Sequence, residues 1–161
     1  MSSLLIPIQM RFGDIDSYGH VNNVTMLQYL EDARVRLTGR QVAAGTVPGV
    51  EEDTSFRALA GERLTVIGRQ EVEYVEQLVY RPDPVFVRVW VSGVGGSSFV
   101  LDYAVQEEDG SRVYAVAQTV VVQIDRASGR PVRLGDAQRA LLGHWSDAPT
   151  RFARRPAPAG A

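Results

Sequence analysis

Two acidic residues, Asp14 and Asp16, lie in a short stretch between a strand-like pattern and a helix-like pattern. Residues 11–23 read Arg-Phe-Gly-Asp-Ile-Asp-Ser-Tyr-Gly-His-Val-Asn-Asn. A carboxylate in such a loop can act as a nucleophile or as a general base. The free N–H groups at the start of the following helix favour anions and can polarise a bound carbonyl group. We expect this loop to carry chemistry on the rigid scaffold that flanks it.

The elements that position the loop follow from the hydrophobic pattern. We expect a first strand over residues 4–12 and one long helix over residues 23–44. The helix is supported by an apolar stripe at helical spacing, which consists of Met26, Leu30, Ala33 and Leu37. Gly45 and Pro48 are expected to end it. Residues 51–62 have the composition of a loop.

The remaining sequence is rich in Val, Ile, Tyr and Phe and predicts strands, over residues 64–79, 85–94, 98–106 and 112–124. Gly, Pro and Asp separate these strands, as in tight turns. We therefore expect an antiparallel meander, with a short C-terminal helix over residues 136–145 that has Asp136 as its N-cap. The pattern predicts an α+β fold in which the long helix covers the apolar face of the sheet.

Composition restricts the function further. The 161 residues fit one domain, expected over residues 1–152, with a disordered tail over residues 153–161. A net charge of −2 gives no reason to expect nucleic acid, and all 17 basic residues are Arg. The absence of Cys excludes disulfides, thiolate metal sites and Cys nucleophiles. No apolar run suits a membrane span and no signal peptide is recognisable, so we expect a soluble cytoplasmic protein.

The loop and the helix that follows, R-F-x-D-x-D-x-x-G-H-V-N-N and then Y-L-E-x-A-R, resemble the signature of the 4-hydroxybenzoyl-CoA thioesterase family of hotdog-fold acyl-CoA thioesterases. The resemblance implies a hotdog fold, in which a five-stranded antiparallel sheet wraps around one long central helix. It also implies hydrolysis of an acyl-CoA thioester to a free acid and CoA, without a metal or an organic cofactor. A thioester on an acyl carrier protein is a variant of the same reaction.

The resemblance assigns roles residue by residue. Asp16 matches the catalytic carboxylate, which acts as nucleophile in one version and as general base in another. Asn23 matches the residue whose backbone N–H polarises the thioester carbonyl. His20 is expected to line the pocket and to orient water or substrate, and Gly19 and Asn22 are expected to contact the substrate. Asp14 is assigned to structure. The turn Asp16-Ser17-Tyr18-Gly19 departs from the D-P-x-G of 4-hydroxybenzoyl-specific members. The G-H-V-N-N form that follows looks closer to that of fatty acyl-CoA members.

Further substrate contacts are expected from two groups of residues. Ser97 and Ser98 follow a Gly-Gly pair in a predicted turn, where the family often has small hydroxyl residues near the thioester. The CoA phosphates need cationic partners, and Arg is the only basic residue available. The candidates are Arg81, Arg57 and Arg63.

The sequence leaves two other functions open. Some hotdog hydratases pair an Asp with a His, so an enoyl-thioester hydratase or dehydratase is an alternative, as is a non-catalytic acyl-thioester binding protein.

The sheet is also expected to pair with another chain. A single helix covers only part of a five-stranded sheet, and sheet edges invite pairing with another chain. We therefore expect a homodimer or a homotetramer, with each active site formed between subunits.

Overall fold

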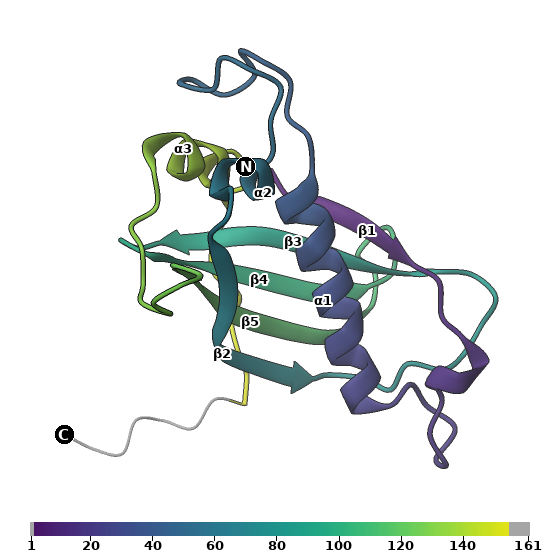
Figure 1. Ribbon diagram of the computed structural model, residues 1–161. Helices are drawn as coiled ribbons and strands as arrows, with labels where there is room; N and C mark the ends of the chain where they lie inside the picture. Colours follow the sequence, from purple (N-terminus) through teal and green to yellow (C-terminus); the bar gives the residue numbers. More distant parts are fainter. Residues whose placement is uncertain (1, 155–161) are drawn as a thin grey trace.

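The computed structural model describes residues 2–154 and consists of an antiparallel sheet wrapped around one long helix (Figure 1). The strands lie in the order β1-β3-β4-β5-β2, and every neighbouring pair is antiparallel. Helix α1 (Asn23–Gly39) crosses one face of this sheet. The predicted hotdog fold is thereby confirmed. The strands are β1 (Leu4–Ile8), β2 (Leu64–Tyr74), β3 (Val85–Val94), β4 (Ser98–Gln106) and β5 (Val113–Ile124).

The core lies between α1 and the inner face of the sheet. The alternating valines of β3 are all buried, as are the α1 residues of the predicted stripe. Two small residues of β5, Ala115 and Ala117, are buried in the same core. Burying a Leu or Val side chain contributes about 1.5–3 kcal/mol, so this stripe fixes the helix on the sheet.

Several expected boundaries are wrong because tertiary hydrogen bonds end the elements earlier. Helix α1 ends at Gly39 rather than at residue 44, since the chain turns extended at Arg40 and Val42 then pairs with Thr54. Strand β1 ends at Ile8 rather than at residue 12. Phe12, the predicted last residue of the strand, instead begins a single 3₁₀ turn, η1 (Phe12–Asp14).

Strand β2 ends at Tyr74 rather than at residue 79. The N–H groups of Val75 and Glu76 both donate to the Tyr114 carbonyl, which turns the chain out of the strand. This early end leaves residues 75–77 exposed and Leu78 buried, and all four line a pocket described below.

Two short helices complete the fold at the end of the sheet where α1 stops (Figure 1). The expected loop over residues 51–62 contains α2 (Phe56–Ala60), capped by the Ser55 hydroxyl, which accepts from the Ala58 N–H at 3.2 Å. Helix α3 (Asp136–His144) has Gly135 rather than the predicted Asp136 as its N-cap, and it ends one residue before the predicted end.

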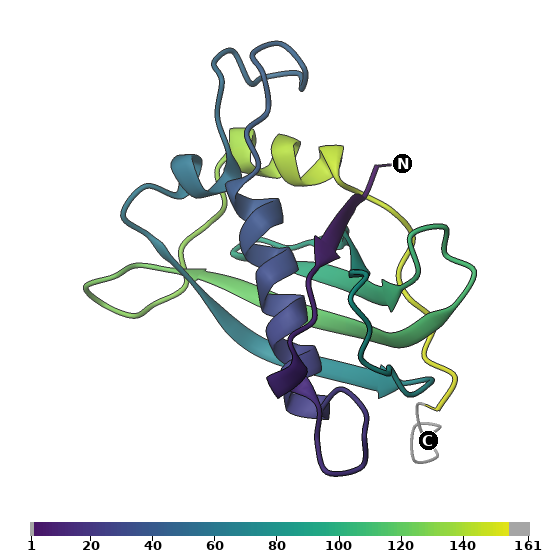
Figure 2. The same ribbon diagram turned by 90° about the vertical axis from the view of Figure 1, so that its right-hand side faces the viewer.

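The chain from residue 146 to residue 154, here called the C-terminal strap, runs down the side of the sheet that faces away from α1 (Figure 2). The Trp90 indole donates to the Ala148 carbonyl at 2.8 Å, and the fully buried Asp102 carboxylate accepts from the Thr150 N–H. The backbone N–H groups of Ala153 and Arg154 donate to the Glu73 carboxylate at 3.2 and 2.7 Å. Of the tail predicted to be disordered, residues 153 and 154 thus make hydrogen bonds to β2, and residues 155–161 lie outside the part described.

No helix within residues 2–154 has the length and apolar character needed to cross a membrane.

Candidate functional site

Asp14 fixes the loop that carries the candidate site. One carboxylate oxygen accepts from the Tyr29 hydroxyl at 2.6 Å and from the Arg11 N–H at 2.9 Å, and the side chain is buried. The Asp14 carbonyl accepts from the Asn22 N–H at 2.9 Å. Asp14 thus joins η1, helix α1 and the last residue of the loop, Asn22. This agrees with the structural role expected for Asp14.

The charges around Asp14 keep it ionised despite its burial. Burial raises the pKa of the Asp14 carboxyl, but the hydrogen bond from Tyr29, the N–H of Arg11 and the Arg11 charge outweigh it, so the pKa is lowered. Burial and the adjacent Asp14 carboxylate raise the pKa of the Tyr29 phenol, which therefore remains a donor.

Asp16 lies in a closed turn between Ile15 and Val21, which pair as an isolated bridge. The Asp16 N–H donates to the His20 carbonyl at 2.9 Å, and the Gly19 N–H donates to the Asp16 carbonyl at 3.1 Å. Gly19 has a φ of +83°, a conformation that favours glycine. The turn therefore brings the His20 backbone next to the Asp16 carboxylate.

The Asp16 carboxylate is held through one of its two oxygens. That oxygen accepts from the Tyr18 N–H at 2.9 Å and, more weakly, from the His20 N–H at 3.4 Å. The second oxygen accepts no hydrogen bond from residues 2–154 and is free to meet a ligand. A carboxylate fixed in this way is oriented before any substrate binds.

Helix α1 begins beside this turn. Asn22 is the N-cap, and its side chain accepts from the Val24 N–H at 2.8 Å. This bond satisfies one of the four N–H groups that a helix start leaves free. The N–H of Asn23 has no acceptor among the described residues, so it can donate to a ligand. The Oδ1 atom of Asn22, a residue predicted to contact the substrate, is thus engaged in the cap.

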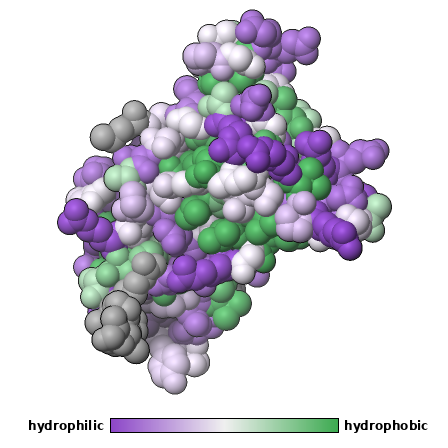
Figure 3. Space-filling view, turned by 90° about the vertical axis from the view of Figure 1, so that its left-hand side faces the viewer, coloured by the Kyte–Doolittle hydropathy of each residue, from purple (hydrophilic) through white to green (hydrophobic). Residues whose placement is uncertain are grey.

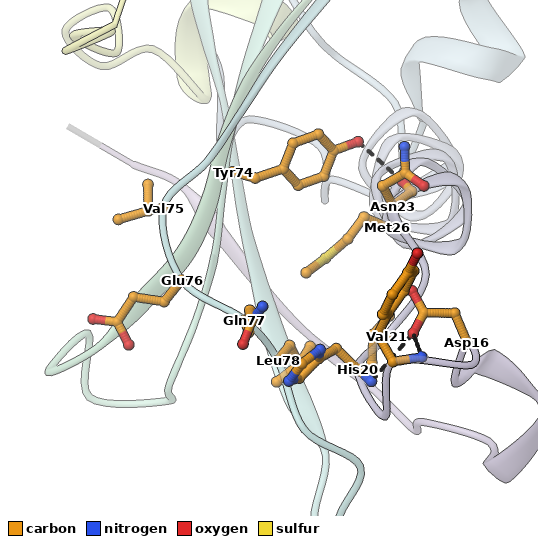
Figure 4. Close-up of a pocket in the computed structure, with 11 residues that line it drawn as sticks. Asp16, His20, Val21, Asn23, Met26, Tyr74, Val75, Glu76, Gln77 and Leu78 are labelled. Carbon is orange, nitrogen blue, oxygen red and sulfur yellow. Dashed lines mark hydrogen bonds between the residues drawn. The ribbon is translucent and has the colours of Figure 1, made fainter.

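A pocket of about 290 Å³ opens where the turn meets the helix start (Figure 4). The Met26 side chain extends into it and the Tyr74 ring lies across from Asp16. The Val21 N–H donates to the Leu78 carbonyl at 2.8 Å, which ties the turn to the opposite wall. The lining is Asp16, Tyr18, His20, Val21, Asn23, Met26, Tyr74, Val75, Glu76, Gln77 and Leu78.

Sequence reasoning missed the wall of this pocket that residues 74–78 form. These residues were expected to continue a strand, where Tyr74 would be an ordinary strand aromatic. Nothing in their order breaks the strand pattern, because the turn depends on hydrogen bonds to Tyr114 on another strand.

Other predicted site residues lie at the opposite end of the sheet. Ser97 and Ser98 form the turn between β3 and β4, where the Ser97 carbonyl accepts from the Gln123 N–H at 2.8 Å. Arg63 directly precedes β2, whereas Asp16 lies near the strand's last residue. Since β2 has 11 residues and a strand rises about 3.3 Å per residue, the two ends lie roughly 30 Å apart. We call them the Asp16 end and the far end.

Two of the three candidate phosphate contacts are already engaged in the protein. Arg81 lies near the Asp16 end, but it binds both carboxylate oxygens of Glu107 at 2.6 and 2.7 Å. Arg57, on α2 at the far end, donates to the Val35 carbonyl at 3.1 Å. Within one chain, the structure therefore groups Asp16, Gly19, His20, Asn22 and Asn23 and leaves Ser97, Ser98, Arg57 and Arg63 apart from them.

No group of three or more His, Cys, Asp or Glu side chains within residues 2–154 is arranged to hold a metal ion.

Residues 10–142 match the model of the thioesterase-like superfamily. The chain belongs to this superfamily. Among curated proteins, the thioesterase-like chain is 27% identical over 138 residues to the uncharacterised protein YsmA of Bacillus subtilis, covering 85% of this chain and 83% of YsmA. The match to the superfamily model confirms the family predicted from the loop signature.

Solved structures support the same family. The chain is 30% identical to a thioesterase from Thermus thermophilus that was crystallised with coenzyme A and Zn, with a TM-score of 0.63 and coverage of 85% of this chain and 95% of that one. The PA5185 protein of Pseudomonas aeruginosa, at 23% identity, shares the fold with a TM-score of 0.71 over 91% of this chain and 94% of that one. The superfamily match and the thioesterase from Thermus thermophilus support a thioester hydrolase, whereas PA5185 supports the fold alone.

The bond between Tyr29 and Asp14 generates a stability prediction. We expect Tyr29→Phe to lower the free energy of unfolding by about 1.5–3 kcal/mol at neutral pH, the range for a hydrogen bond to a charged group. Because the folded pKa of Asp14 is lowered, this contribution is present above the unfolded pKa and is lost as pH falls through the folded pKa. Urea unfolding across this acidic range measures both effects.

Tyr80→Phe is the matched control, since the Tyr80 ring is partly exposed and meets Phe12 edge to face. Equal stability of the two variants at neutral pH would show that the bond to Asp14 does not anchor the loop.

Proposed function

We propose that the protein hydrolyses acyl-CoA thioesters, with Asp16 as the catalytic carboxylate and the Asn23 N–H as the donor to the thioester carbonyl. The observation that supports this best is that Asp16, with one carboxylate oxygen free of hydrogen bonds from the described residues, and Asn23, whose N–H has no acceptor among them, line the same pocket. The superfamily match agrees with the chemistry that these two groups can perform.

In the proposed reaction, the thioester carbonyl oxygen accepts from the Asn23 N–H. Asp16 then either attacks the carbonyl carbon, forming an anhydride that water opens, or removes a proton from a water molecule that attacks the same carbon. In both versions the C–S bond breaks, CoA leaves as the thiol after taking up a proton, and the acyl group leaves as the acid. A backbone donor at the developing oxyanion contributes about 3–4 kcal/mol to lowering the barrier.

His20 has a supporting role in this proposal. Its side chain lines the pocket (Figure 4), and the residue belongs to the turn that Asp16 closes. From there the imidazole can orient water or the acyl group, while Gly19 permits the turn that aims the Asp16 carboxylate.

The proposed reaction also requires cations that bind the phosphates of CoA. The thioesterase from Thermus thermophilus was crystallised with coenzyme A. In our protein, Arg81 does not line the pocket and is already paired with Glu107. We infer that other cations serve the CoA phosphates, and that a second copy of the chain supplies them.

Strand β2 provides the edge for such a second copy. It lies at the end of the sheet order, so one side of its backbone is unpaired by any other strand of the sheet. Val66 and Ile67 are 39% and 42% exposed, and a band of apolar surface crosses the face of the molecule on this side (Figure 3). An edge strand of this length with exposed apolar side chains is a template for pairing with another chain.

A two-fold axis through the middle of β2 would join the two ends of the sheet. In a symmetric antiparallel pair centred on Arg69, Leu64 of one copy lies opposite Tyr74 of the other. Arg63 then lies beside the pocket wall that follows Tyr74. Arg126 lines the same surface hollow as Arg63, so the far end of one subunit brings two guanidinium groups to the Asp16 end of its partner.

Asp16 is tested by removing its charge. We expect Asp16→Asn to reduce kcat for acyl-CoA hydrolysis by about a hundredfold or more, the scale for losing a general base, because the amide can neither attack nor accept the proton. A panel of acyl-CoA and acyl carrier protein thioesters, followed with a thiol-detecting dye, measures the rate. Asp83→Asn, in an exposed turn, is the matched control and should leave it unchanged. Near wild-type hydrolysis by Asp16→Asn would refute the assignment, whereas hydrated product without released thiol would indicate a hydratase.

A charged substitution on β2 tests the proposed pairing of two chains along this edge. Light scattering at micromolar concentration should give twice or four times the chain mass of 17.7 kDa for the wild type. We expect Ile67→Glu to shift the mass toward that of one chain and to raise KM for acyl-CoA by more than Arg63→Gln does, because both partner guanidinium groups are lost. Leu5→Glu, at a similarly exposed site on β1, should do neither, because β1 forms the opposite edge. An active monomeric wild type would exclude the shared site.

The phosphate contact is tested by neutralising Arg63. We expect Arg63→Gln to raise KM for acyl-CoA several-fold, with kcat nearly unchanged, because the lost charge contacts only the nucleotide. The wild-type KM should rise with ionic strength more steeply than that of the variant. Arg40→Gln, at the exposed end of α1, is the control. Equal KM for the two variants would remove Arg63 from the site.

A further inference from the structure

Tyr74 connects the edge strand β2 to the start of helix α1. Its hydroxyl donates to the Asn23 carbonyl at 3.0 Å, across 51 residues of sequence. Figure 4 shows the ring crossing the pocket from the end of β2 toward the first turn of α1. The bond therefore acts on the residue whose N–H faces the proposed substrate carbonyl.

The first turn of a helix is held by fewer backbone bonds than its centre, because its N–H groups have no acceptors within the helix. The N-cap Asn22 satisfies the N–H of Val24, but it leaves the Asn23 N–H unpartnered within the described part of the chain. Without another contact, this turn would fray more readily than the rest of α1. The Tyr74 hydroxyl supplies a contact from outside the helix.

Tyr74 is itself fixed from the other side. Its carbonyl accepts from the Arg154 guanidinium at 2.9 Å, and the neighbouring Glu73 carboxylate accepts the N–H of Arg154 at 2.7 Å. The following residue, Val75, donates its N–H to Tyr114 at 2.8 Å. These bonds hold Tyr74 between the C-terminal strap and β5, so its hydroxyl can restrain the helix start rather than follow it.

Burial raises the pKa of the Tyr74 phenol, so that the hydroxyl remains a neutral donor throughout the neutral range.

We propose that Tyr74 is a positioning residue: its hydroxyl fixes the first turn of α1 so that the Asn23 N–H stays aimed into the pocket opposite Asp16. This inference rests on the proposed function, because it assigns Tyr74 a role through the Asn23 donor. Loss of the bond leaves the pocket and the carboxylate in place, but the donor then has to be ordered during the reaction. The cost falls on the transition state and not on substrate binding.

Tyr74→Phe tests the proposal, since it keeps the ring and removes only the hydroxyl. We expect kcat to fall about tenfold, with KM within about twofold of the wild-type value. Hydrogen exchange in the first turn of α1 should become faster, while exchange in the centre of the helix stays unchanged. Tyr80→Phe is the control and should alter neither measurement.

Two results would overturn the proposal. One is an unchanged exchange rate in the first turn of α1. The other is a loss of activity that only follows the fraction of unfolded protein, measured by thermal unfolding of the same samples. If the wild type releases no thiol from any thioester of the panel, the proposed function fails, and the exchange measurement alone then decides whether Tyr74 restrains the helix start.

Discussion

The hydrogen bond from the Tyr29 hydroxyl to the buried Asp14 carboxylate, at 2.6 Å, joins the loop that carries Asp16 to the core face of α1. Asp14 also receives the N–H groups of Arg11 and Asn22, so the start and the end of the loop meet at one residue. A loop of this length would otherwise have to be ordered by the substrate at an entropic cost. Because the anchor is buried and ionised, the turn around Asp16 is preformed.

In the proposed function, the two ends of the sheet carry different parts of the site. The Asp16 end holds a fixed carboxylate, a free helix N–H and a pocket with both apolar and polar walls, and we propose that thioester hydrolysis takes place there. Arg63 and Arg126 lie roughly 30 Å away at the far end. The exposed edge of β2 offers a physical reason for this arrangement, because antiparallel pairing of two edges brings opposite ends together.

The sequence predicted the features that depend on local pattern. Alternating valines predicted β3, and the stripe containing Leu30 predicted the buried face of α1, because burial imposes a period of two on strands and of 3.6 on helices. It did not predict the contacts that depend on distant partners. Tyr74 lies in the strand predicted for it, but its bond to the Asn23 carbonyl was not predicted, and neither was the bond of Arg154 to the Glu73 carboxylate. Neither partner can be recognised from spacing.

Mixed dimers test most directly whether two chains build one site. Purified Asp16→Asn and Arg63→Gln proteins, each defective alone, are mixed, exchanged and assayed at low acyl-CoA concentration. If each site combines Asp16 of one chain with Arg63 of the other, half of the sites in every mixed dimer are fully wild type. Roughly a quarter of all sites should then recover both the wild-type KM and kcat. Activity equal to the mean of the two parent proteins would contradict the account, because it would place both residues in the site of a single chain.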